Sequence, residues 1–106
     1  MNTTPPTTNS TMPVPDRRKL ISALGNPIRW DMLQELSIGE PLMVSELAQR
    51  VGCSLSLASK HMQVLLKAGL VLHRRRLYQI PPQHLPQPGT RVVDYGHCLL
   101  RLPYSA

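Results

Sequence analysis

The chain has 106 residues, enough for one domain and too few for two. Lys and Arg number 12 against 6 Asp and Glu, and this net charge of +6 indicates a polyanionic partner, either nucleic acid or an anionic membrane surface. No apolar run approaches the roughly 20 residues that span a bilayer, no signal pattern opens the chain, and two cysteines make no disulfide framework, so we expect a cytoplasmic protein that binds no membrane.

The first residues and the first helix differ sharply in composition. Residues 1–15 are Thr, Pro, Asn and Ser with almost no apolar side chains, so we predict a disordered N-terminal tail. From Asp16 the pattern becomes helical, with Leu20 and Leu24 on one face. Gly25 is expected to end this helix.

A second helix is predicted immediately afterwards. Asn26 is a good N-cap, and Pro27 is tolerated at the first helical position. Gly39 and Pro41 break the helix, and residues 42–44 are expected to be extended.

Two further helices lie close together around a short turn. Ser45 is predicted to cap the third helix, with Glu46 favourably placed in the first turn. The three-residue turn Gly52-Cys53-Ser54 leads to a fourth helix over about 56–68, and Gly69 suits the position after its end.

The apolar period then changes from helical to strand-like. Residues 70–74 and 77–80 are predicted to form two short strands with Arg74, Arg75 and Arg76 at their junction. The tip has no Gly or Asn, which leaves the turn type open.

The remaining residues are less regular. Residues 81–89 are Pro-rich and are expected to form a fixed, extended connector. Residues 91–102 fit either a helix or a strand, and Gly96 together with the Val-Val pair favours the strand.

The fourth predicted helix has two distinct faces. A helical wheel places polar residues on one side (Ser56, Ser59, Lys60, Gln63 and Lys67) and apolar residues on the other (Ala58, Met62, Leu65 and Leu66). No Asp or Glu occurs from Gly52 to Thr90, whereas an ordinary solvated face mixes acids with lysines. This pattern favours contact with phosphate, which a carboxylate would repel.

From Ser45 to Val71 the order is helix, turn, helix and strand, which predicts a helix-turn-helix followed by the first strand of a wing. We therefore expect a mainly α fold with a small β-hairpin wing, a winged helix-turn-helix, in which helix 56–68 enters the major groove of double-stranded DNA. The predicted DNA-binding residues are Ser54, Ser56, Leu57, Ser59, Lys60, Gln63, Lys67, Arg74, Arg75 and Arg76. The three arginines alternatively form a charged tip that deters edge aggregation.

Two segments resemble the signatures of the ArsR-type (ArsR/SmtB) winged-helix repressors. LISALGNPIRWDMLQEL resembles the family's opening pattern, and SLSLASKHMQVLLKAGLV resembles its recognition-helix pattern. The resemblance covers about residues 18–80 and implies a homodimer that represses transcription at a palindromic operator until a signal releases it. It also implies DNA-helix positions at Ser54, Ser56, Ser59, Lys60 and His61. The helical wheel instead turns His61 toward the core, which favours a packing or capping role.

The sequence departs from this family in its sensing sites. LMVSELAQ holds no Cys or His where many members bind metal, and Asp94 with His97 lacks a second ligand pair, so we predict no metal and no cofactor. Cys53 and Cys98 are candidate thiol sensors, although single cysteines are among the most buried residue types.

The C-terminal segment also departs from the family, because it replaces a long dimer helix. We expect it to pack on the first helix and on a partner chain; alternatively, it only completes the monomer core. The domain prediction is a tail over 1–15, a DNA-binding domain over 16–80 and a packing or dimerisation segment over 81–106.

Three other functions compete with a homodimeric DNA-binding repressor. A winged-helix protein-interaction module would show a more apolar face. An enzyme is not expected, because the sequence lacks a nucleophile elbow, a phosphate loop and paired carboxylates. RNA modules usually present stacking aromatics, and only Tyr78 lies near the proposed face. An inducer, whether small-molecule or redox, is not specified by the sequence.

Overall fold

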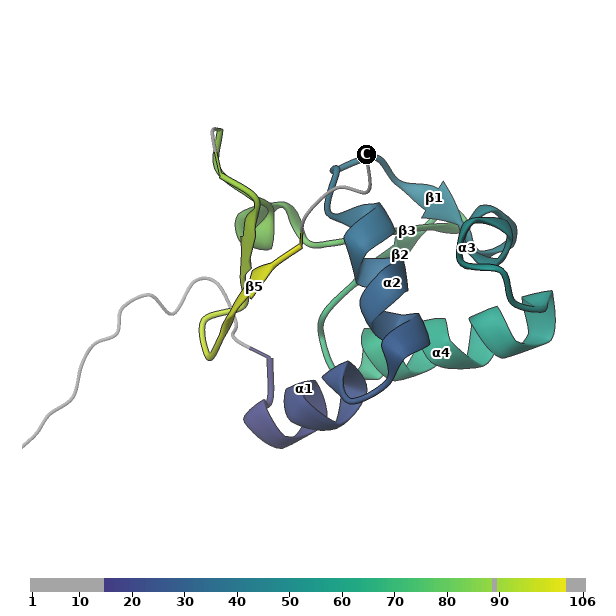
Figure 1. Cartoon of the computed structure of the whole chain (residues 1–106), viewed down its shortest axis with the longest axis horizontal. Coiled ribbons are helices and arrows are strands. Elements are labelled where there is room, and N and C mark those ends of the chain that lie inside the picture. The colour runs from purple at the N-terminus through teal and green to yellow at the C-terminus, as the bar shows by residue number, and fades with distance from the viewer. Residues whose placement is uncertain (1–14, 89, 103–106) are drawn as a thin grey trace, which may run out of the picture.

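The computed structural model describes residues 15–88 and 90–102, so the predicted tail lies outside the described residues except for Pro15. The described helices are α1 (Arg17–Leu24), α2 (Pro27–Leu36), α3 (Val44–Val51), α4 (Leu55–Lys67) and the short 3-10 helix η2 (Pro82–His84). The described strands are β1 (Leu42–Met43), β2 (Leu72–Arg74), β3 (Leu77–Gln79), β4 (Val92–Asp94) and β5 (Leu99–Arg101). Figure 1 shows the four longer helices grouped on one side of the hairpin that β4 and β5 form.

The first two helices each begin at a side-chain cap, and the sequence predicted the one at Asn26. The Asp16 carboxylate accepts hydrogen bonds from the backbone N–H groups of Arg18 and Lys19, at 2.9 and 3.1 Å. Asn26 caps α2 in the same way, with its side-chain oxygen 2.8 Å from the backbone nitrogen of Ile28. These bonds satisfy amide groups that a helix start leaves without intrahelical partners.

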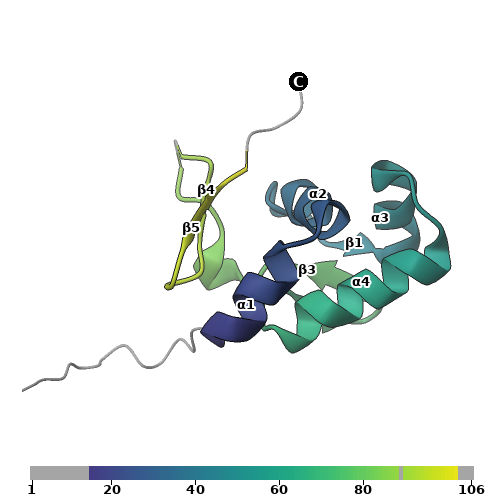
Figure 2. The same ribbon diagram turned by 60° about the horizontal axis from the view of Figure 1, so that its bottom comes forward.

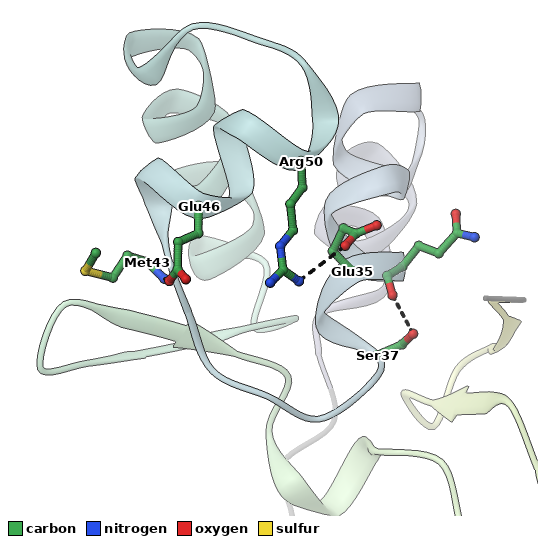
Figure 3. A network of polar contacts seen from close by, with 6 residues as sticks. Glu35, Ser37, Met43, Glu46 and Arg50 are labelled. Atoms are coloured by element: carbon green, nitrogen blue, oxygen red, sulfur yellow. Dashed lines mark hydrogen bonds and ion pairs between the residues drawn. The ribbon is translucent and has the colours of Figure 1, made fainter. Parts of the chain in front are cut away.

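The start of α3 corrects the prediction that Ser45 is its cap. The helix already begins at Val44, and Ser45 is its second residue. The Glu46 carboxylate reaches back to accept a hydrogen bond from the backbone N–H of Met43, at 2.8 Å (Figure 3). A carboxylate in the first turn therefore replaces the expected serine cap, and it also suits the positive end of the helix dipole.

Two polar contacts lie at the end of α2, and the first of them connects α2 with α3. Arg50 of α3 forms an ion pair with Glu35 of α2, with 3.5 Å between nitrogen and oxygen (Figure 3). The Ser37 hydroxyl donates to the backbone oxygen of Gln34 at 2.6 Å, closing the last turn of α2. Because both ionic side chains are partly exposed, the pair stabilises the fold little. The buried Leu47 and Ala48 hold α3 against the core, and this burial stabilises the fold more than the ion pair does.

The wing is part of a three-stranded antiparallel sheet with the order β1-β3-β2. The stretch predicted to be extended before α3 provides β1, where Leu42 pairs with Tyr78. In the hairpin itself, His73 of β2 pairs with the same Tyr78 of β3. The two strands match the predicted hairpin but are shorter: β2 begins at Leu72, after the buried Leu70 and Val71, and β3 ends at Gln79, before Ile80.

Buried aliphatic side chains from every longer helix form the core, including Leu20, Met32, Leu33, Leu36, Leu47, Met62 and Leu65. Gly69 follows α4 with a φ of +80°, the left-handed conformation that glycine adopts without strain. Pro15, assigned to the tail from sequence, is buried beside this turn. No described helix is long and apolar enough to cross a membrane.

The C-terminal segment is a β-hairpin, as the sequence favoured, and its inner face completes the core. Val93 and Leu100 pair with each other and are both buried. The buried Tyr95 hydroxyl donates to the backbone oxygen of Leu70 at 2.8 Å, which joins the hairpin to the end of α4. The preceding connector is not purely extended as predicted: η2 places His84 with its Nδ1 2.7 Å from the backbone oxygen of Asp94.

Candidate nucleic-acid interface

The first turn of α4 is fixed by a side-chain cap. The Ser54 Oγ accepts a hydrogen bond from the backbone N–H of Leu57, at 3.1 Å. The helix thus begins at Leu55, one residue earlier than predicted. A serine hydroxyl that accepts this bond still has its own hydrogen to donate, so Ser54 retains a donor for a phosphate. Gly52, with a φ of +78°, ends α3 and makes the tight turn between the helices.

The two faces of α4 separate as the helical wheel predicted. Ala58, Met62 and Leu65 are buried, whereas Leu66 is half-buried. The predicted DNA-binding residues on this helix lie on its other side: Ser56, Leu57, Lys60, Gln63 and Lys67 are exposed and Ser59 is half-buried. The structure therefore presents this set of serines, lysines and a glutamine on one helix surface.

His61 points inward, so it is not available as a base-contacting residue. It is 8% exposed, and its Nδ1 lies 3.1 Å from a guanidinium nitrogen of Arg29 in α2. The same guanidinium donates to the backbone oxygens of Ala23 and Ser22, at 2.7 and 3.4 Å, at the end of α1. Because an arginine only donates, Nδ1 must be the unprotonated acceptor. Burial and the nearby Arg29 charge lower the pKa of His61 below its usual 6.5.

The wing carries Arg74, Arg75 and Arg76, all exposed. Arg75 and Arg76 form the turn with φ values of 50° and 69°, a conformation in which Asn and Gly are common and Arg is rare. Gln63 of α4 donates to the Tyr78 hydroxyl at 3.4 Å, a long hydrogen bond that joins the polar face of α4 to the wing.

Tyr78 is buried beneath this contact and does not offer a stacking surface to a ligand. Its ring stacks on His73 with centroids 4.0 Å apart and an interplanar angle of 3°. Only 4% of Tyr78 is exposed. Tyr78, the aromatic residue that the sequence placed near the interface, therefore packs within the sheet. It is not available to stack on an RNA base, which counts against RNA binding.

The positive surface extends beyond the predicted residues. Arg18 and Lys19 of α1, together with Lys67 of α4, line a groove of about 370 Å³ whose floor includes Val64 and Ala68. Arg18 and Lys19 were not among the predicted interface residues, because nothing in the sequence indicates that α1 packs against α4. Figure 2 shows α1 beside the C-terminal end of α4.

Leu55 is the second omission from the predicted interface. It is 55% exposed at the first position of α4. The predicted helix start at residue 56 left Leu55 in the turn. The available signal for the earlier start was Ser54, because serine is a preferred N-cap residue.

The structure does not bring the two candidate thiol sensors together. Cys53 lies in the turn between α3 and α4, and Cys98 lies between β4 and β5, at opposite ends of the molecule (Figures 1 and 2). Burial and the Asp94 charge raise the pKa of the Cys98 thiol, which lowers its reactivity. Within residues 15–88 and 90–102, no group of three or more His, Cys, Asp or Glu side chains is arranged to hold a metal.

Comparison with known proteins agrees with this geometry. A family model described as a helix-turn-helix domain matches residues 24–79, more than half of the chain, from the end of α1 to the end of β3. No curated protein sequence matches the chain significantly.

Proposed function

Because the chain belongs to a family of helix-turn-helix domains, we propose that it is a sequence-specific, double-stranded DNA-binding transcriptional regulator that acts as a homodimeric repressor. The observation that carries this proposal is the exposed surface of α4, where Ser56, Lys60, Gln63 and Lys67 lie together. Because no Asp or Glu occurs from residue 52 to 90, neither this surface nor the wing presents a carboxylate of its own to phosphate.

In the proposed complex, α4 lies in the major groove and its N-terminal half approaches the base edges. The Gln63 amide suits adenine, which offers one donor and one acceptor in that groove. Its present bond to Tyr78 is long at 3.4 Å, so exchanging it for a base costs little. Lys60 and Lys67 contact flanking phosphates, and this contact supplies affinity without sequence information.

The wing arginines contact the backbone beside the same groove. Arg74, Arg75 and Arg76 have exposed guanidinium groups, and the described residues show no ion pair that would hold them elsewhere. Guanidinium forms two parallel hydrogen bonds with a phosphate, which suits a clamp on the DNA backbone.

The homodimer and the repressor role are supported by the resemblance of the α1–α2 and α4 segments to ArsR-type repressors and by one feature of the C-terminal hairpin. Leu99 is 66% exposed on the outer face of β5, next to a strand edge. Within the described residues, the unpaired edge of this two-stranded sheet is available to pair with a second subunit. A dimer would place two α4 helices on a palindrome, and its occupancy of a promoter would block transcription.

Selection from a random-sequence duplex library tests this proposal. We expect the full chain to enrich a palindromic sequence and to bind it as two chains per duplex in analytical ultracentrifugation. Enrichment of a site without two-fold symmetry, bound by one chain, would exclude the dimer. Failure to enrich any sequence would exclude specific recognition and leave the protein-interaction module as the better interpretation.

A further inference from the structure

The first turn of α4 exposes two leucines at the tip of the proposed recognition helix. Leu55 is 55% exposed and Leu57 is 39% exposed. Their neighbours in this turn, Ser54 and Ser56, are small and polar, so they do not cover the leucine side chains. The turn therefore combines small hydroxyl groups with two large apolar groups, next to the exposed Lys60.

This turn is held in place before any ligand arrives. The hydrogen bond from the Leu57 backbone N–H to the Ser54 Oγ fixes the backbone at Leu57 itself, at 3.1 Å. The buried Ala58 and Met62 hold the next turn against the core. A side chain on a fixed helical turn loses little backbone entropy on binding, which suits it to discriminate between ligands that differ by one group.

Leucine can recognise only one kind of group in the major groove. Base edges there present hydrogen-bond donors and acceptors, and the single large apolar group among them is the C5 methyl of thymine. Lys60, in the next turn of the helix, attracts the DNA backbone, so the charge near Leu57 fits DNA better than an apolar protein surface.

We propose that Leu57 reads thymine methyl groups, so that the sequence preference of this protein includes thymine at the positions that face the first turn of α4. This inference rests on the proposed function, because it assigns a base contact within the same protein–DNA interface. It adds an apolar readout to the polar contacts of Ser56, Ser59 and Gln63.

Removing the methyl groups from the DNA tests the inference directly. A duplex selected from the random library is prepared once with thymine and once with deoxyuridine in its place, which changes only the C5 methyl. Wild-type affinity is expected to fall about fourfold for each methyl group contacted, as the transfer free energy of one buried methylene-sized group requires. The Leu57→Ala variant is expected to bind both duplexes nearly equally, because it has lost the contacting side chain.

Val64 provides the matched control. It is 38% exposed on the same helix, almost the same as Leu57, but lies two turns away from the tip. Val64→Ala should therefore keep the full preference for thymine over deoxyuridine. Leu55 lies two positions before Leu57 and projects about 200° away from it around the helix, so Leu55→Ala should also keep most of this preference.

The outcomes separate this inference from the proposed function. Equal wild-type affinity for the two duplexes, with salt-dependent binding retained, would overturn the thymine contact and leave the DNA-binding function intact. The same loss in wild type and in Leu57→Ala would also overturn it, since the methyl would then act elsewhere or through DNA shape. Absence of binding to every duplex would overturn both.

Discussion

Arg75 and Arg76 adopt a backbone conformation that is costly for their side chains. Both have positive φ values, and a residue with a Cβ in this region loses about 1–2 kcal/mol relative to the right-handed form. A two-residue hairpin turn of this type normally selects Asn followed by Gly, which avoid that cost. Two arginines at strained positions are consistent with a functional role for their charges at the wing tip.

This conflict predicts a trade-off between stability and binding. Replacing Arg75→Asn together with Arg76→Gly should raise the free energy of unfolding by about 1 kcal/mol, because the turn is relieved of strain. The same variant should bind duplex DNA more weakly and lose nearly two units of salt slope. Urea unfolding and fluorescence anisotropy measure the two quantities. In the control variant Arg75→Lys with Arg76→Lys, the charges and the backbone strain both remain, so neither the stability nor the DNA affinity should change much. If the Arg75→Asn, Arg76→Gly variant is stabilised but binds DNA as strongly as wild type, a DNA contact at the wing tip is contradicted.

His61 connects protonation to stability through its contact with Arg29. Its pKa in the folded protein is below the 6.5 of an unfolded histidine, chiefly because of burial and then because of the Arg29 charge. Just below pH 6.5, the unfolded chain therefore binds more protons than the folded chain does. The stability that neutral His61 contributes is complete above pH 6.5 and declines as the pH falls toward the pKa of the folded state.

A pH series of unfolding free energies checks this direction. Wild type should lose stability as the pH falls below 6.5, and His61→Gln should lose less, because the glutamine oxygen can accept from Arg29 but does not titrate. His84, which is also buried, is unchanged in both proteins and so cancels in the comparison. Parallel pH curves for the two proteins would contradict the assignment of the titration to His61.

At the scale of elements, one hydroxyl joins the C-terminal hairpin to the DNA-binding unit. Tyr95 is fully buried, and burial raises the pKa of its hydroxyl far above the usual range, so it stays a donor to the Leu70 backbone oxygen. Tyr95→Phe should lower the free energy of unfolding by about 1–3 kcal/mol, since it leaves a buried oxygen without a partner.

Tyr78→Phe is the control for this change, because its hydroxyl meets only Gln63 at 3.4 Å, and the Gln63 side chain can turn to water. Its loss should cost clearly less in the same urea titration. Equal effects of the two substitutions would show that the Tyr95 bond has no special part in joining the hairpin to α4.

The order of the elements was predictable where local signals agree. Asn26-Pro27, the Gly52 turn and Gly69 mark helix ends by backbone chemistry that acts within a few residues, and α2, α3 and α4 end or begin near them. The start of α3 was wrong because Glu46 caps the Met43 amide, and a serine at position 45 gave the stronger local signal. The turn at Arg75-Arg76 was left open because its sequence opposes its conformation.

At the scale of the whole molecule, sequence periodicity located the exposed face of α4 but not its surroundings. The wheel separates Lys60 from Met62 correctly, because a helix has one period whatever it packs against. The positions of Arg18 and Lys19 beside Lys67 depend on the packing of α1 against α4, which brings together residues far apart in sequence. Likewise, the sequence favoured a capping or a packing role for His61. The structure shows that His61 packs against α2, where its ring contacts Arg29, 32 positions away in the sequence.

The central claim is that α4 and the wing form one DNA-binding surface. The most direct measurement is the affinity for a selected duplex across a salt series by fluorescence anisotropy, for wild type, Lys60→Ala, Arg75→Ala and Arg101→Ala. Arg101 lies on β5 and provides the control, because its loss changes net charge equally away from α4. We expect steep salt dependence, a slope that falls by about 0.9 for Lys60→Ala and for Arg75→Ala, and no change for Arg101→Ala. No binding at low salt, or the same slope in all four proteins, would contradict the account.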